Sequence, residues 1–238
     1  IRFGGPNGVS FTLDMLSFTL FILIVGRIGT LELTATTLAF NINSLAFMPL
    51  FGAGMALSTL VGQRLGRDDP EGAEYCTWTG VHLAVGYMGV MSILYLGLPD
   101  LFLMPYGVHA SGPEFVAARD LARSLLRIVA IYCVFDAGFM MFTAALKGAG
   151  DTQYVMYGSV VLGWTVMVLP PVILVTWFDA GIYTAWAFIC CFLIAGCVLF
   201  YRRFRGGKWK QMRVIEVTDD DTSDPRPVVA GTIGHMEA

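Results

Sequence analysis

Charged side chains are scarce in this sequence. Only 14% of the 238 residues are charged and 56% are hydrophobic, whereas soluble domains are about 25% charged. The charged residues that do occur lie between long apolar stretches. This composition excludes an ordinary soluble domain and predicts a membrane protein.

The sequence also lacks the residue patterns of several site classes. Its five cysteines have spacings that fit neither a disulfide framework nor a zinc site, so we interpret them as small buried hydrophobic residues: Cys76, Cys133, Cys190, Cys191 and Cys197. No basic patch is interleaved with aromatic residues, so we expect no nucleic-acid partner. No cofactor is expected apart from a transported or coupling ion.

The first residue is Ile1 rather than methionine. The first apolar segment is too long for a signal peptide and contains an acid. We therefore expect the chain to be a fragment of a longer polypeptide.

Six apolar segments are long enough to cross a bilayer, which takes about 20 residues. They are expected at residues 8–27, 34–61, 74–98, 121–146, 154–178 and 180–201. Only helices fit, because these runs do not alternate with the two-residue period of barrel strands. The predicted fold class is an all-α polytopic membrane protein. A six-helix bundle would occupy residues 1–201, and a basic, then acidic tail at residues 202–238 is expected to be disordered.

Two connections carry clear local signals. Asp68 or Asp69 can cap the third helix, and Pro70 suits its first turn. Residues 98–114, by contrast, contain too many Pro and Gly residues to continue that helix.

The distribution of Lys and Arg predicts the orientation. The side with the tail holds the larger group: Arg2, Arg64, Arg67, Lys147 and the cluster from Arg202 to Arg213. The opposite side holds Arg27, Arg119, Arg123 and Arg127. We therefore expect a cytoplasmic tail and, with six spans, both termini on that side. Arg127 is expected to reach the surface or to pair with Glu114 or Asp120.

Two acids, Asp14 and Asp136, lie inside predicted spans. A carboxylate at that depth costs about 2.5–3.5 kcal/mol on insertion scales. No Lys or Arg lies at the depth of Asp136, and His82 is interpreted as a core histidine. A buried acid without a basic partner takes up a proton or binds a cation. Asp14 and Asp136 are therefore the main candidate functional residues.

Polar residues accompany both acids at helical spacing, and such stripes face a bundle interior or a water-filled cavity. Tyr132 lies one turn before Asp136. Met and aromatic residues suit the binding of bulky apolar cations. The candidate cavity-lining residues are Ser10, Ser17, Asn41, Ser44, Met48 and Met140.

Helix breakers interrupt two of the spans. Pro49, followed by Gly52 and Gly54, lies mid-way along the second, and Pro170 and Pro171 lie in the fifth. They are candidate hinges, although a static kink for packing explains them equally well.

Three segments together resemble the C-terminal half of a multidrug and toxic compound extrusion (MATE) transporter. They are GRIGTLELTATTLA at residues 26–39, NINSLAFMPLFGAGMALSTLVGQRLGRDD at 41–69 and VFDAGFMMFTAALKGAGDT at 134–152. Their order and spacing carry the resemblance, which extends from Gly8 to Tyr201. It implies one bundle of a twelve-helix, two-bundle antiporter in a bacterial inner membrane. The missing N-terminal six-helix bundle and the lipid bilayer would be its partners.

The resemblance also implies an activity and a site. Family members export organic cations and other drug-like molecules in exchange for sodium or protons. In the sodium-linked branch, the matching cation-site positions are Asp14, Asp136 and Tyr132, with Asn41 as a further polar position. Sodium could then bind between Asp14 and Asp136. At Asp14 the family more usually has glutamate, which is one methylene longer.

Other functions compete with this interpretation. A flippase for lipid-linked saccharides would need arginines well inside the spans, but here they lie at the ends. A membrane-embedded enzyme could use two aspartates as an acid/base pair, yet no flanking motif of such enzymes is present. A non-transporting scaffold would leave the buried acids unexplained. We therefore expect a transporter rather than an enzyme.

Overall fold

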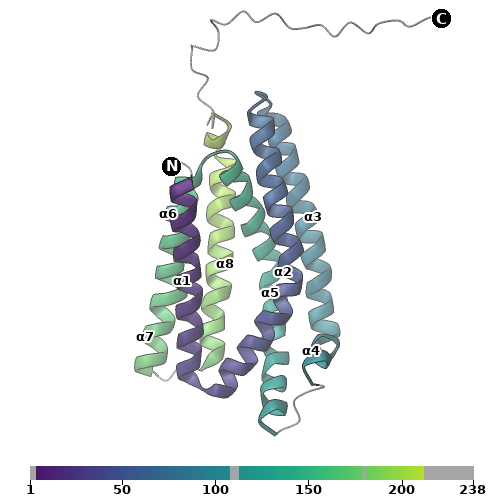
Figure 1. Cartoon of the computed structure of the whole chain (residues 1–238), viewed down its shortest axis with the longest axis vertical. Coiled ribbons are helices and arrows are strands. Elements are labelled where there is room, and N and C mark those ends of the chain that lie inside the picture. Colours follow the sequence, from purple (N-terminus) through teal and green to yellow (C-terminus); the bar gives the residue numbers. More distant parts are fainter. Residues whose placement is uncertain (1–3, 108–112, 179–180, 212–238) are drawn as a thin grey trace, which may run out of the picture.

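The computed structural model describes residues 4–107, 113–178 and 181–211, which are helical apart from short turns (Figure 1). The helices, in chain order, are α1 (Gly4–Ile28), α2 (Thr30–Leu65), α3 (Pro70–Gly97), α4 (Pro99–Gly107), α5 (Pro113–Gly148), α6 (Thr152–Leu162), the π-helix η1 (Gly163–Val168), α7 (Leu169–Phe178), α8 (Ile182–Arg205) and the 3-10 helix η2 (Lys208–Gln211). This confirms the predicted all-α class.

Five helical stretches among the described residues are long and apolar enough to cross a membrane: Thr30–Leu65, Pro70–Gly97, Glu114–Gly148, Thr152–Val175 and Ile182–Arg205. Met15–Ile28 of α1 forms a shorter apolar helix. These six segments correspond to the six predicted spans. The last helix continues to Arg205, beyond the expected end at residue 201. Residues 212–238, most of the predicted tail, lie outside the described part.

The helices form two groups with α8 between them. Figure 1 shows α1, α6 and α7 on the left, α2 and α3 on the right, and α8 in the middle. Helix α5 packs against α2, α3 and α8 and is the most buried of the five long spans. The α2–α3 and α5–α6 turns lie at the upper end of the view, here called the α2–α3 end. The α1–α2 turn lies at the opposite, α1–α2 end.

The start of α3 matches its sequence signals. Asp69 is the N-cap, and its Oδ1 accepts a hydrogen bond from the backbone N–H of Gly72 at 2.8 Å. Its Oδ2 accepts another from Arg64 Nη1 at 2.9 Å. The Gly72 bond, followed by the Arg64 bond, holds the pKa of the exposed Asp69 carboxyl below its usual range. The predicted cap is therefore confirmed at Asp69.

Helix α4 was not predicted. The chain does leave the α3 helix at Leu98, as expected, but Pro99 then starts a new helix, where its missing N–H costs nothing. Asp100 in the first turn of α4 binds Arg123 at 2.5 Å and Arg119 at 3.2 Å, both on α5. Long-range ion pairs of this kind leave no trace in local sequence patterns.

Two alternatives were expected for Arg127: an ion pair with Glu114 or Asp120, or a side chain that reaches the surface. Its side chain is exposed, and within the described residues no ion pair joins it to Glu114 or Asp120. Asp120 binds Arg123 instead, at 3.3 Å. The alternative expectation, that Arg127 reaches the surface, agrees with its exposure.

The prolines of the fifth span change the helix type without ending the helix. Pro170 and Pro171 have no N–H to donate to the carbonyls four residues earlier, and their rings crowd those carbonyls. The preceding turn, Gly163–Val168, widens into a π-helix, and the chain continues as α7. Pro49 lies inside the continuous helix α2, which changes direction part-way along its length in Figure 1.

Candidate functional site

Asp136 is a buried acid in the middle of the central helix α5. Its side chain is 8% exposed. Within the described part of the chain, no hydrogen bond or ion pair reaches its carboxylate. The other acid that is buried among the described residues, Asp151, has a partner in Arg203 at 2.7 Å. Asp136 therefore stands out as a buried acid with no stabilising partner.

The residues around Asp136 on α5 show which helices it faces. Cys133 Sγ lies 3.7 Å from Asn43 Oδ1 on α2. Met140 packs against Gly54 on α2, where an added Cβ would lie 3.6 Å from Met140 Cε. Tyr132 faces α8 instead, through Trp186. At 100° per residue, the direction of Asp136 on α5 lies between these two directions, so Asp136 faces between α2 and α8.

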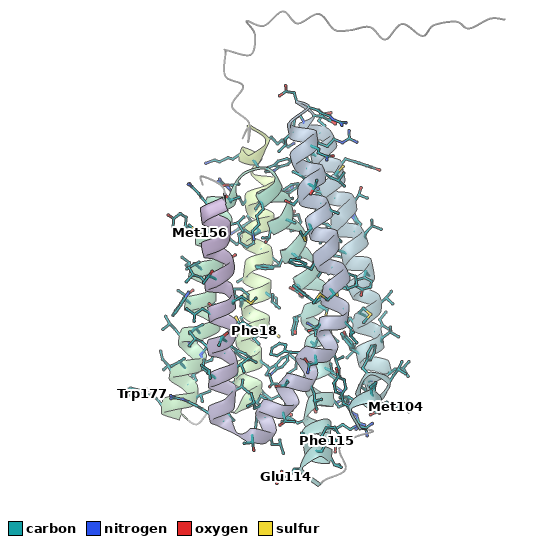
Figure 2. All side chains as sticks on the ribbon, in the orientation of Figure 1. Phe18, Met104, Glu114, Phe115, Met156 and Trp177 are labelled. Atoms are coloured by element: carbon teal, nitrogen blue, oxygen red, sulfur yellow. The ribbon has the colours of Figure 1, made fainter. Side chains whose placement is uncertain are left out.

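Tyr132 belongs to an aromatic cluster that joins four helices. Its ring centroid lies 6.5 Å from that of Trp186, which stacks on Phe40 at 5.0 Å. Phe40 also contacts both aromatic residues contributed by α1. One of these, Phe18, is labelled in Figure 2 between the two groups of helices. The aromatic cluster is made of Phe18, Phe21, Phe40, Tyr132 and Trp186.

The aromatic cluster lies on one side of Asp136. Helix α5 runs from the α1–α2 end towards the α2–α3 end (Figure 1), and Tyr132 precedes Asp136 by one turn. Trp186 is fully buried, and its Nε1 donates to Thr36 Oγ1 at 3.3 Å. The Tyr132 ring of the cluster therefore lies one helical turn nearer the α1–α2 end than Asp136 does.

The residues predicted on α1 are only partly described. Asp14 and Ser10 lie in this helix, but their side chains fall outside the described part of the structure. Ser17 is buried, donates to the Leu13 carbonyl at 2.9 Å and lies next to Gly163 of the π-helix. Helix α1 packs mainly on α6, α2 and the π-helix, and less on α7 and α8. The proposed meeting of Asp14 and Asp136 stays a prediction.

The cavity-lining candidates on α2 face outward. Asn41, Ser44 and Met48 are exposed, and the Ser44 hydroxyl is bonded to the Phe40 carbonyl of its own helix at 2.8 Å. Their cavity-lining role stays a prediction and concerns a space outside this bundle. Sequence reasoning missed Asn43, which contacts α5. Its polarity within an apolar span was a usable signal, but the choice of helix face was not fixed by the sequence.

Two smaller interpretations are corrected. His82 is exposed on α3 rather than in the core, and its Nδ1 lies 2.7 Å from the Trp78 carbonyl oxygen. Cys191 is also exposed, whereas Cys133 is buried as expected. The described residues contain no group of three or more side chains arranged to hold a metal ion.

Comparison with known proteins decides the family. The MatE family model matches residues 6–172, which is more than half of the chain. The chain belongs to the MatE family. The resemblance found in the sequence is thereby confirmed, and because family members are transporters, the competing enzyme interpretation loses its support.

Individual relatives agree with this assignment. The chain is 28% identical over 204 residues to a probable multidrug resistance protein NorM of Brucella suis biovar 1, covering 86% of this chain and 43% of the relative. A probable NorM of Xanthomonas campestris pv. campestris is 30% identical over 165 residues, with 69% and 34% covered. The chain therefore spans about half the length of the relatives it matches.

Solved structures show the same fold. A MATE structure in complex with MaL6 superposes with a TM-score of 0.77 at 18% identity, covering 88% of this chain and 46% of the other. A transporter of the MOP superfamily from Pyrococcus furiosus, described as having a binding pocket of reverse polarity, gives a TM-score of 0.75 at 19% identity, with 94% and 48% covered. The chain thus has the fold of about half of such a MatE transporter.

Proposed function

We propose that this chain forms one six-helix bundle of a secondary antiporter that exports organic cations and other drug-like molecules in exchange for sodium or protons. The observation that carries the proposal is the burial of Asp136 without a partner, on the central helix of a MatE bundle. Placing a charged side chain inside a membrane costs free energy, and the charged residues found there typically mark ion or proton pathways.

Asp136 is the coupling carboxylate in this proposal. When ionised it attracts a cation into the space between α2 and α8, and a bound sodium ion or proton neutralises it. Tyr132, one turn away, offers a hydroxyl oxygen, and Asp14 of α1 is the further acid of the site. A bound ion cancels the negative charge that would attract a cationic substrate. Because the ion and the cationic substrate compete for that charge, entry of the ion is coupled to export of the substrate.

The substrate class rests on the relatives, which are named multidrug resistance proteins. The exposed face of α2 contains Met48, Phe51 and Met55, side chains that suit bulky apolar cations. We propose that this face borders a cavity shared with the N-terminal six-helix bundle of a two-bundle transporter. The protein would lie in the bacterial inner membrane with its C-terminal tail in the cytoplasm.

The test is efflux of a fluorescent organic cation from vesicles that contain the full-length protein, driven by a sodium gradient or by a pH gradient. Asp136→Asn keeps the side-chain volume but removes the charge. We expect it to abolish ion-driven efflux while the protein still inserts and folds. Glu114→Gln, at an exposed acid of the same helix, is the matched control and should transport normally.

Two outcomes would contradict the proposal. Normal ion-driven efflux by Asp136→Asn would make Asp136 a structural acid and remove it from the coupling site. Absence of efflux by the unaltered protein under both gradients would argue against drug export altogether.

A further inference from the structure

A groove runs along the membrane-spanning surface between α2 and α3. Its volume is about 440 Å³. Both helices are long and apolar enough to cross a bilayer. The walls are mostly small or aliphatic, with Tyr75 and Tyr87 at the two ends of the α3 side, and α5 contributes Met141. Representative lining residues are Ala53, Ala56 and Leu60 of α2, Gly80 and Leu83 of α3, and Met141 of α5.

Small side chains create this groove. Ala53 and Ala56 are exposed on α2, and each side chain extends only one methyl group from the helix. On α3, Gly80 has no side chain, and Leu57 fills the space where a Cβ would stand, at 3.1 Å. The lining contains no charged residue, and Leu83 at its rim is 71% exposed. Its chemistry is that of the bilayer interior.

The groove has the length of about one leaflet. On α3 its lining extends from Tyr75 to Tyr87, which at 1.5 Å per residue is about 18 Å. The hydrocarbon core is about 30 Å thick, so one leaflet contributes about 15 Å. Tyr75, which is 74% exposed, lies at the end of the groove nearest the polar α2–α3 turn. Tyrosine is enriched at the membrane–water interface.

The width of the groove discriminates between possible occupants. Dividing its volume by that length gives a mean cross-section of about 24 Å². An α-helix with its side chains is about 10–12 Å across, so a helix lying over the groove could insert only its side chains. A chain of methylene groups fits, because its width is set by carbon–carbon contacts of about 4 Å.

We propose that this groove binds one acyl chain of a membrane phospholipid from the leaflet at the α2–α3 end. The phosphate would then lie at the level of the α2–α3 turn. Arg64 in that region is bonded to Asp69, whereas Arg67 is exposed at the turn itself. The chain, rather than the headgroup, is the part that the groove recognises, since the lining is apolar.

The test uses a phosphatidylcholine with a photoreactive diazirine in the middle of one acyl chain. The protein is reconstituted in vesicles of phosphatidylcholine containing this probe, illuminated, and its adducts are mapped by peptide mass spectrometry. We expect the adduct yield at Thr79 and Leu83 to be several-fold higher than at Leu169 and Ile173, exposed residues of α7 outside the groove.

Variants separate a specific groove from general lipid contact. Ala53→Phe with Ala56→Phe fills the groove from exposed positions and should reduce the Thr79 and Leu83 adducts to the α7 level. Ala56→Leu, a milder change, should reduce them partly if the double variant does not fold. Ala187→Phe, at an exposed alanine of α8 outside the groove, should change nothing.

Two results would overturn the proposal. Equal yields on the groove and on α7 would mean ordinary bilayer contact only. Groove adducts that persist in a folded groove-filling variant would mean that the chain lies elsewhere. The readout is independent of transport, so it stands or falls separately from the antiport proposal.

Discussion

Gly148 marks a very close approach of α5 to α2. A Cβ at this position would meet the backbone carbonyl of Ser58, with the Ser58 Cα at 2.9 Å. Backbone atoms in a helix cannot move aside as a flexible side chain can. We expect Gly148→Ala to destabilise the bundle by about 1–3 kcal/mol through overpacking, measured as a lower thermal unfolding midpoint in detergent.

Gly86→Ala on α3 is the matched control. An added Cβ there meets nothing within 4 Å, and alanine favours the helix by up to about 1 kcal/mol. Its unfolding midpoint should stay equal or rise slightly. Equal losses from both substitutions would show that the contact at Gly148 is not tight.

The ion pair between Arg203 and Asp151 ties the end of α8 to the start of α6. Arg203 also lies over the Tyr154 ring, 4.3 Å from its centroid. Because Asp151 is only 5% exposed, Arg203→Met leaves a buried carboxylate unpaired, which costs about 3–5 kcal/mol. Arg64→Met breaks an exposed pair with Asp69 and should cost much less, because solvent screens the attraction between exposed charges.

Chemical unfolding of the two variants measures this difference. Adding Asp151→Asn to Arg203→Met should recover part of the loss, because the unpaired charge is then gone. A loss for Arg203→Met no larger than for Arg64→Met would contradict a buried, stabilising pair.

Single residues were predictable from the sequence where their partners are local. The Asp69 cap needs only the next three residues, and it was found. The contact between Asn43 and Cys133 joins residues 90 positions apart. It depends on how α2 is rotated against α5, and helical spacing alone left that rotation open. Asn41 was chosen from the same segment and faces outward.

At the scale of elements, α4 is docked on α5 by charge. The hydrogen bond from Arg123, and then the nearby charge of Arg119, hold the pKa of the exposed Asp100 carboxyl below its usual range. A carboxyl with a lowered folded-state pKa stabilises the folded form above its unfolded pKa of about 3.9. That contribution is lost as the pH falls through the folded-state pKa.

We therefore expect α4 to stay docked at pH 5–7 and to loosen progressively below about pH 4. Hydrogen–deuterium exchange of residues 99–107 measures the docking. Asp100→Asn should produce the faster exchange already at neutral pH, whereas Glu114→Gln, at an exposed acid of the same end, should not. Exchange in Asp100→Asn as slow as in the unaltered protein would show that the apolar contacts of α4 suffice.

The elements themselves were largely predictable, because long apolar runs between polar turns allow little else. Their finer form was not. Pro170 and Pro171 predicted a hinge or a kink in the fifth span. Widening of the preceding turn into a π-helix, however, depends on neighbouring helices that keep the two halves of the span aligned. Residues 98–114 have the composition of a loop, since Pro99 and Pro105 are helix breakers in most positions. Pro99 instead starts α4, and Asp100 fastens that helix to α5.

At the scale of the whole molecule, α5 is central and α8 connects the two groups of helices. The sequence indicated Asp136 as an unusual acid but not that its helix would be the most buried long span. Nor did it indicate that Trp186 would join α2, α5 and α8 beside it. These features arise from packing among distant segments. They place Asp136 where a bound ion would influence several helices at once.

An ion bound at Asp136 should therefore stabilise the whole bundle. Binding to the folded state alone adds about 1.4 kcal/mol for each tenfold rise in ion concentration above the dissociation constant. If sodium is the coupling ion, the unfolding midpoint of the purified protein should rise when NaCl replaces KCl at constant ionic strength. Asp136→Asn should abolish that rise, while Glu114→Gln should retain it. If protons are the coupling ion, replacing KCl with NaCl should leave the unfolding midpoint unchanged. The pH dependence of the midpoint should then differ between Asp136→Asn and the unaltered protein. A sodium effect that survives Asp136→Asn would place the ion elsewhere.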